Sequence, residues 1–314
     1  MSRAPHIFAG PYIHRSSEHR KDAAWIAAAL ERPSSRFVVL WQDQNLIHPT
    51  HEPQAALVER ACLPKEALDQ AIFLGQRENT AFFAIEIKDR SVCALPSGSA
   101  FKELRAWGGS LTHPEAGLLA YARALVYWRA RHHHCGQCGA PNMAIDAGHV
   151  MRCTREGCAT QAFPRIDPAI IVLVTHEEQA LLGRQASWPQ GRYSTIAGFV
   201  EPGESLEDAV RREVKEETGV DATHVRYHSS QPWPFPSSLM IGFEAKASSS
   251  LLACPDGELE DARWFSYADI QAGTPLLPPP ASISFQLIAA WYARGTGRRL
   301  IDEPAIIHQQ KRPA

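Results

Sequence analysis

The strongest structural signal in this 314-residue chain is the stretch Gly198-Phe-Val-Glu-Pro-Gly-Glu204-Ser-Leu-Glu-Asp-Ala-Val-Arg-Arg212-Glu213-Val-Lys-Glu216-Glu217-Thr-Gly219-Val220. Apolar residues recur from Leu206 to Val214 at the spacing of one helix face, and Gly219 follows as a helix C-cap. The pattern predicts an amphipathic helix over Leu206 to Thr218.

Three acidic residues of this helix point to metal and phosphate chemistry. Glu213, Glu216 and Glu217 are spaced i, i+3 and i+4, so their carboxylates lie on one face and repel one another. A hard divalent cation with oxygen ligands compensates such a cluster, and Mg²⁺ typically links carboxylates to substrate phosphates. Arg212 is placed to pair with Glu204 and hold the preceding loop. A solvated acidic face is the alternative, but it leaves the glycines, Glu204 and Arg212 unexplained.

The remaining sequence predicts a mixed α/β protein of several domains. We expect a helix near Ala23 to Leu30, strands at Arg36 to Trp41 and Ala81 to Ile87, and a helix near Pro114 to Arg131. A buried strand at Ala169 to Thr175 begins a catalytic domain, and a last helix spans Ile283 to Tyr292. The predicted domains are residues 1–130, 131–166 and 167–314.

Four of the seven cysteines form a metal-binding pattern. Cys135, Cys138, Cys153 and Cys158 give the spacing C-x2-C-x14-C-x4-C, which is typical of a zinc ribbon with a closed tetrahedral shell. Such a shell leaves no position for water, so its role is structural. Unrelated buried cysteines are the alternative. The neighbouring His132, His133 and His134 are interpreted as a solvated helix end and not as ligands.

The composition limits the class of protein. The chain is 45% hydrophobic and 21% charged with a formal net charge of −2, as in ordinary globular proteins. This balance argues against a broad basic surface for duplex nucleic acid. No run of 18 apolar residues and no signal-peptide pattern occurs, so we expect a cytoplasmic protein without membrane association.

Two motifs resemble a known family. The quoted stretch fits G-x5-E-x7-R-E-U-x-E-E-x-G-U, with U apolar, which resembles the signature of the Nudix hydrolases. Ser230 to Ser238 reads Ser-Gln-Pro-Trp-Pro-Phe-Pro-Ser-Ser and is similar to the motif of the NADH pyrophosphatase subfamily, which also carries a zinc ribbon before the catalytic domain. The resemblance covers Cys135 to Ser284, whereas the N-terminal region is similar only in position and length.

The resemblance implies a fold and an activity. The fold would be a Nudix α/β/α sandwich, with an N-terminal Nudix-like α/β domain and a small zinc ribbon between them. The activity would be hydrolysis of NADH or NAD⁺ to nicotinamide mononucleotide and AMP, together with removal of NAD caps from RNA 5′ ends. It further implies catalytic Mg²⁺ or Mn²⁺, one structural Zn²⁺ per chain, and a homodimer.

The resemblance also assigns site residues. It makes Glu213, Glu217, Glu258 and the backbone carbonyl of Ala197 metal ligands, with Glu216 in the same catalytic cluster. Glu260 and Asp261 compete with Glu258, and either Glu217 or Glu216 is the general base. The residues that match substrate-binding positions are Phe163, Gln231, Pro232, Trp233, Pro234, Phe235, Pro236, Ser237, Ser238 and Ser284. Phe163 stands where relatives often have tyrosine, and Trp233 and Phe235 offer flat faces for a base or nicotinamide ring.

Three other functions remain open from the sequence. A Nudix hydrolase for ADP-ribose or diadenosine substrates would share the acidic residues but does not require the second motif. A sensor of NAD-related metabolites usually lacks some of the acidic residues, which this chain retains. A zinc-ribbon RNA-binding module is disfavoured by the neutral charge and the composition of the ribbon.

Overall fold

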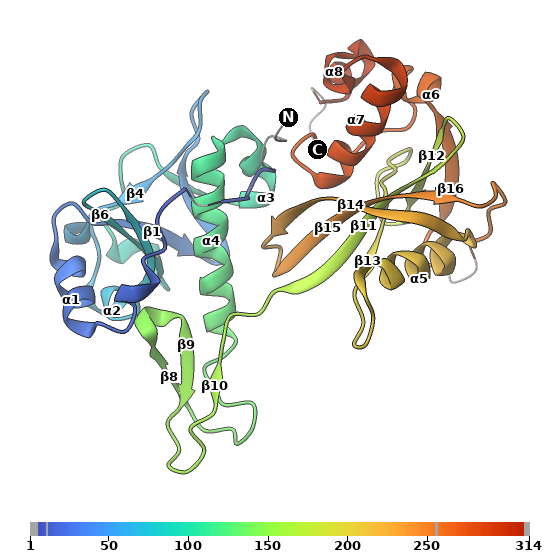
Figure 1. Ribbon diagram of the computed structural model, residues 1–314. Coiled ribbons are helices and arrows are strands. Elements are labelled where there is room, and N and C mark those ends of the chain that lie inside the picture. The colour runs from blue at the N-terminus through green and yellow to red at the C-terminus, as the bar shows by residue number, and fades with distance from the viewer. Residues whose placement is uncertain (1–5, 11, 255–256, 311–314) are drawn as a thin grey trace. The chain divides into compact units, whose positions relative to one another are not determined.

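The computed structural model describes residues 6–10, 12–254 and 257–310 (Figure 1). The chain divides into two compact units. The first comprises residues 1–166 together with 232–237, and the second comprises residues 167–231 and 238–314. No helix in the described ranges is long and apolar enough to cross a lipid bilayer.

The first unit has a mixed sheet with strand order β3-β2-β1-β6-β5, in which β4 also pairs with β1 and β7 with β2. Its elements are α1 (Ala23–Glu31), β1 (Arg36–Trp41), β2 (Gln44–His48), β3 (Gln54–Ala55), β4 (Leu57–Val58), α2 (Lys65–Leu68), β5 (Ile72–Arg77), β6 (Thr80–Glu86), β7 (Ala100–Lys102), α3 (Leu104–Trp107) and α4 (His113–Ala130).

The helices α1 and α4 pack against the sheet of the first unit. Phe37 and Val39 of β1 share a core with Phe73 and Phe83, against which Trp25 and Ile26 of α1 pack. The long helix α4 contacts β1, β5 and β6. Because successive strand residues point to opposite faces, the continuous apolar run Phe37 to Leu40 is buried on both sides.

A three-stranded ribbon follows α4 in the chain. It has the order β10-β9-β8, with β8 at Asn142–Ile145, β9 at Val150–Cys153 and β10 at Gln161–Ala162. The predicted small zinc-ribbon module therefore exists as a separate sheet within the first unit.

The second unit has a mixed sheet with strand order β14-β15-β11-β12-β16, in which β13 also pairs with β11. Its elements are β11 (Asp167–His176), β12 (Gln179–Arg184), β13 (Ile196–Phe199), α5 (Leu206–Thr218), β14 (Ala222–Trp233), β15 (Ser238–Ala247), β16 (Asp261–Ser266), α6 (Tyr267–Gln271), α7 (Ile283–Thr296) and α8 (Pro304–Gln310).

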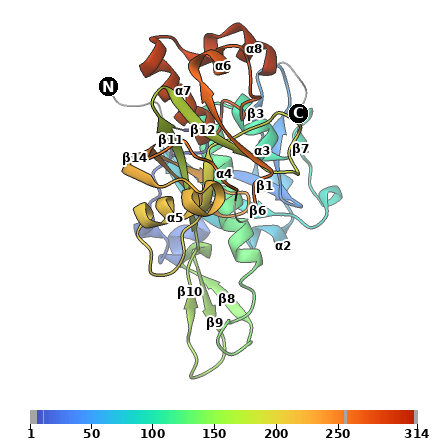
Figure 2. The same cartoon turned by 90° about the vertical axis from the view of Figure 1, so that its right-hand side faces the viewer.

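Strand β11 divides the second unit into two cores. Ile170, Val172 and Val174 pack with residues of α5, whereas Ile171 and Leu173 pack with residues of α7. The helices α5 and α7 accordingly lie on opposite faces of the sheet in both views (Figure 1, Figure 2). This is the α/β/α sandwich that the sequence predicts.

The predicted helix over Leu206 to Thr218 is confirmed at both ends. The Ser205 side chain accepts a hydrogen bond from the backbone N–H of Asp208 and caps the N-terminus. Gly219 closes the C-terminus with a φ of 72°, a left-handed conformation that favours glycine. The sequence analysis did not predict the final helix α8.

Candidate active site

The acidic residues of α5 differ in burial. Glu213 and Glu217 are only 9% and 5% exposed, whereas Glu216 is exposed. Leu206, expected on the buried side, is half-buried, while Ala209, Val210 and Val214 are fully buried. A solvated acidic face therefore does not describe this helix, because two of its carboxylates are withdrawn from bulk water.

Gly198 makes room for one of these carboxylates. It lies in β13, which pairs antiparallel with β11, and a Cβ atom at this position would stand 1.9 Å from Cδ of Glu213. Any side chain larger than hydrogen would displace the Glu213 carboxylate. Glycine is required at position 198 for close approach and not for an unusual backbone conformation.

Arg212 connects the helix to the preceding loop. Its Nε and Nη2 donate to Oε1 and Oε2 of Glu204 at 2.6 and 2.9 Å, a bidentate pair, and Nη2 also donates to the Phe199 carbonyl at 2.9 Å. Its Nη1 donates to Glu213 and Glu216 at 2.9 and 3.0 Å. The Arg212 guanidinium lowers the pKa of Glu204 to about 2. The predicted pairing of Arg212 with Glu204 is confirmed.

The carboxylate cluster has an unbalanced negative charge. Burial raises the pKa of Glu213, Arg212 lowers it, and the negative charges of Glu216 and Glu258 raise it again. One arginine thus faces several carboxylates, which is the environment that a divalent cation neutralises. The residues present fit such a group. Among the described residues, however, only the four cysteines bring their ligand atoms all within 4.8 Å of one another.

The three acidic candidates that follow β15 have different environments. Glu260 is in ion contact with Arg184, and Asp261 pairs with Arg263 at 2.6 Å and accepts a hydrogen bond from the Tyr193 hydroxyl. Glu258 instead interacts electrostatically with Glu213. These contacts support Glu258 as the member of the carboxylate cluster.

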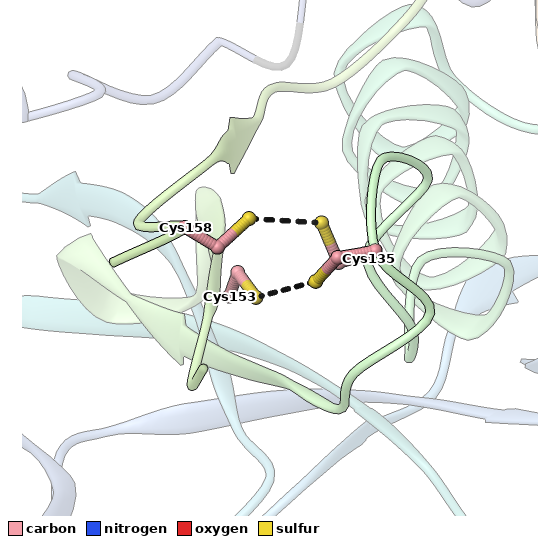
Figure 3. A group of neighbouring side chains, drawn as sticks. Cys135, Cys153 and Cys158 are labelled. Atoms are coloured by element: carbon pink, nitrogen blue, oxygen red, sulfur yellow. Dashed lines mark hydrogen bonds between the residues drawn. The ribbon is translucent and has the colours of Figure 1, made fainter. Parts of the chain in front are cut away.

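The four predicted zinc ligands lie together (Figure 3). The Sγ atoms of Cys135 and Cys158 are 3.8 Å apart, and those of Cys138 and Cys153 are 3.5 Å apart. A tetrahedral shell with Zn–S bonds of about 2.3 Å places its sulfurs about 3.8 Å from one another. The cluster therefore has the dimensions of a zinc site, and no histidine belongs to it in the part of the chain that the structure describes.

Two predicted substrate residues have buried side chains with structural partners. The Gln231 amide donates to the Ala281 carbonyl and accepts from the Ile283 backbone N–H, both at 2.8 Å. The Ser284 hydroxyl lies 2.9 Å from the hydroxyls of Ser194 and Thr195. Both side chains hold the N-terminus of α7 in place. Because the Ser284 hydroxyl is occupied by these contacts, Ser284 would contact a substrate through its backbone.

Of the other predicted substrate residues, Ser238 begins β15 in the second unit, and the rest are in the first unit. The segment 232–237 belongs there, and the rings of Trp233 and Phe235 meet edge to face with centroids 5.2 Å apart. Both rings are half-buried. Phe163 follows the ribbon strand β10 and is 58% exposed, so its ring face is accessible.

Sequence patterns did not indicate two residues that contact predicted site residues, one in each unit. Phe199 is 59% exposed and directly follows Gly198, and its carbonyl is bound by Arg212. An aromatic residue next to a glycine, shortly before an acidic helix, was a usable signal in the sequence. Arg123 on α4 donates to the Pro234 carbonyl, a contact between residues 111 positions apart that no local pattern indicates.

A mixed sheet between two helical layers, with two buried carboxylates on one helix and a separate four-cysteine ribbon, is the arrangement expected of a metal-dependent hydrolase. A family model described as "NUDIX domain" matches residues 165–287. A second, described as "NADH pyrophosphatase-like rudimentary NUDIX domain", matches residues 34–128.

Curated relatives extend the match to most of the chain. It is 41% identical over 348 aligned residues to "NAD-capped RNA hydrolase NUDT12" of Macaca fascicularis, covering 93% of this chain and 74% of the relative. It is 37% identical over 257 residues to "NAD-capped RNA hydrolase NudC" of Pseudomonas putida (strain W619), covering 81% and 89%. A solved NUDIX hydrolase from Nitrosomonas europaea aligns with a TM-score of 0.42 and 22% identity over 53% of this chain and 94% of that one.

The chain therefore belongs to the Nudix hydrolases, and it combines a Nudix domain with an NADH pyrophosphatase-like rudimentary Nudix domain. Membership of this family implies a divalent cation in the active site, and the four-cysteine cluster indicates a structural zinc site. The resemblance inferred from the two sequence motifs is thus confirmed.

Proposed function

We propose that this enzyme hydrolyses the pyrophosphate bond of NADH and NAD⁺ to nicotinamide mononucleotide and AMP, and that it removes NAD caps from RNA 5′ ends. The observation that carries the proposal is the intact carboxylate cluster of α5 in a chain about 40% identical to relatives named as NAD-capped RNA hydrolases. The stretch Ser230 to Ser238, which is similar to the motif of the NADH pyrophosphatase subfamily, supports NADH and NAD⁺ as substrates.

The residues of the second unit have distinct proposed roles. Glu213, Glu217, Glu258 and the Ala197 carbonyl would hold Mg²⁺ or Mn²⁺, which when bound neutralises the diphosphate and activates a water for attack on phosphorus. Either Glu217 or Glu216 would act as the general base for that water, because both carboxylates project from α5 beside the proposed ligands. Arg212 and Gly198 keep the Glu213 carboxylate in position.

The proline-rich loop supplies the proposed substrate contacts outside the carboxylate cluster. Pro232, Pro234 and Pro236 restrict the backbone on which Trp233, Phe235, Ser237 and Ser238 are presented, so little ordering entropy is lost on binding. Phe163 offers a further stacking face. We also propose a homodimer. We further propose domain boundaries at residues 1–130, 131–166 and 167–314; the separate family matches over residues 34–128 and 165–287 support a division between the first and last of these domains.

The zinc proposal has a direct test. Elemental analysis of the purified protein is expected to give about one zinc per chain. The Cys135→Ser variant should lose that zinc and melt at a lower temperature, because metal binding supplies folding free energy to a closed site. Full zinc content in this variant would show that the metal is held elsewhere.

Substrate specificity tests the functional proposal. We would measure kcat/KM for NADH, ADP-ribose and diadenosine substrates with Mn²⁺, followed by release of the cap from NAD-capped RNA. We expect a preference for NADH over ADP-ribose of about tenfold or more, and tenfold is equivalent to about 1.4 kcal/mol of selective binding. A preference for ADP-ribose would be consistent with a Nudix hydrolase but would contradict NADH as its substrate. Absence of hydrolysis of every substrate would favour a sensor.

A further inference from the structure

Arg123 contacts the proline-rich loop from within the first unit. It lies on α4 and is only 7% exposed. Its Nε donates to the Pro234 carbonyl at 2.9 Å, and its guanidinium carbon stands 5.3 Å from the centroid of the Phe235 ring. One side chain therefore holds both the backbone and an aromatic ring of the loop.

Aromatic packing completes the support of the loop. Phe8 meets Trp233 and Phe235 edge to face, with centroids 5.9 and 5.4 Å apart. The Phe8 ring packs directly against Gly108: a Cβ atom added at Gly108 would lie 2.3 Å from the Phe8 ring. The rings of the loop are thus fixed on the Phe8 side by close packing.

The burial of Arg123 is costly and lacks the usual compensation. Among the described residues Arg123 forms no salt bridge, and its buried Nη1 has no hydrogen-bond partner. Burial lowers the pKa of the guanidinium, an effect that Asp43 and Glu103 partly offset from a distance. An apolar residue of similar length would fill this space without a desolvation penalty. The charge at this position therefore calls for a role other than packing.

We propose that Arg123 is a positioning residue that fixes the Pro232–Ser237 loop in the conformation that binds the nicotinamide or adenine ring. This inference rests on the proposed function for its effect on NADH, but its effect on the loop stands by itself. Loss of a charge-assisted hydrogen bond should weaken binding of substrate and transition state equally, because Arg123 touches the loop and not the reacting phosphates.

The test compares Arg123→Met with Arg131→Met. Arg131 follows α4, lies over the Tyr127 ring at 3.5 Å, and makes no contact with the loop that the structure records. Arg123→Met should raise KM for NADH about tenfold with kcat within about twofold, as expected for one lost charge-assisted hydrogen bond. The amide protons of Trp233, Phe235 and Ser237 should exchange faster with solvent deuterium. Arg131→Met should change neither quantity.

Two results separate failure of this inference from failure of the proposed function. If the wild-type enzyme does not cleave NADH, the proposed function fails, but the exchange rates of the loop amides still test Arg123. Unchanged loop exchange and unchanged KM in folded Arg123→Met would overturn the inference. If Arg123→Met does not fold, Arg123→Lys retains the charge and loses the planar fork, and should show a smaller shift in the same two quantities.

Discussion

The two Nudix-type sheets of this chain share a pairing scheme and differ in one helix. In the first unit β1 pairs parallel with β6 and antiparallel with β2 and β4. In the second unit β11 pairs parallel with β15 and antiparallel with β12 and β13. A long helix follows the parallel strand in each, α4 with 18 residues and α7 with 14.

The difference lies in the helix that follows β4 in the first unit and β13 in the second, the strands that pair antiparallel with β1 and β11 respectively. The second unit has the 13-residue helix α5 there, whereas the first has only the four-residue helix α2, with Glu66 as its single carboxylate. The sheet is retained in the first unit without an acidic cluster, so this fold does not depend on a helix such as α5. Hydrolysis is therefore expected to depend on the acidic residues of α5 in the second unit and to be independent of Glu66 in the first unit.

The largest effect should come from removing a buried carboxylate of α5. Glu213→Gln keeps the size of the side chain but removes the charge that faces the metal site, so kcat/KM for NADH should fall by about 10²-fold or more. The matched change Glu66→Gln, on the exposed face of α2, should leave kcat/KM unchanged. Equal losses in the two variants, measured with circular dichroism to verify folding, would mean that both helices serve the active site.

A smaller effect should follow from filling the space beside Glu213. Gly198→Ala places a methyl group where the carboxylate stands, and a displacement of about 1 Å at a catalytic group can cost about 10²-fold in rate. The comparison variant is Gly98→Ala in the first unit, where the added Cβ meets nothing within 4 Å but the backbone φ of 73° is unfavourable for alanine. That variant should lose about 1 kcal/mol of stability and keep full activity. Normal kcat in Gly198→Ala would show that Glu213 can move without consequence.

The smallest effect concerns pH. Burial lowers the pKa of His149 in the first unit to about 4, and its Nε2 lies 2.7 Å from the Phe73 carbonyl. Below the unfolded pKa of about 6.5 the unfolded state binds a proton that the folded state does not, so stability falls with pH until about 4. At pH 5 the loss should be about 2 kcal/mol.

The second unit should resist the same acidification. Because Arg212 lowers the pKa of Glu204 to about 2, the stability from this pair is present above about 4.5 and is lost only as pH falls toward 2. Hydrogen exchange of β1 and β11 between pH 7 and pH 5 measures each unit separately. His149→Gln, which leaves all four cysteines in place, should remove the pH dependence of β1; if it does not, another group is responsible.

Local sequence patterns predict much of this structure. The limits of β1 and α5, the ribbon cysteines and the pairing of Arg212 with Glu204 all follow from short-range periodicity, capping and spacing. The burial of Glu213 does not follow, because it depends on the approach of β13 at Gly198. The Arg123 contact also depends on distant segments, and α8 has no strong periodic signal of its own.

The decisive experiment is product identification after incubation of the purified enzyme with NADH and Mn²⁺. We expect reduced nicotinamide mononucleotide and AMP in equal amounts, and neither product with Glu217→Gln. Intact NADH after incubation with the wild-type enzyme, or cleavage at the glycosidic bond of nicotinamide, would contradict the claim that this chain is an NAD(H) pyrophosphatase.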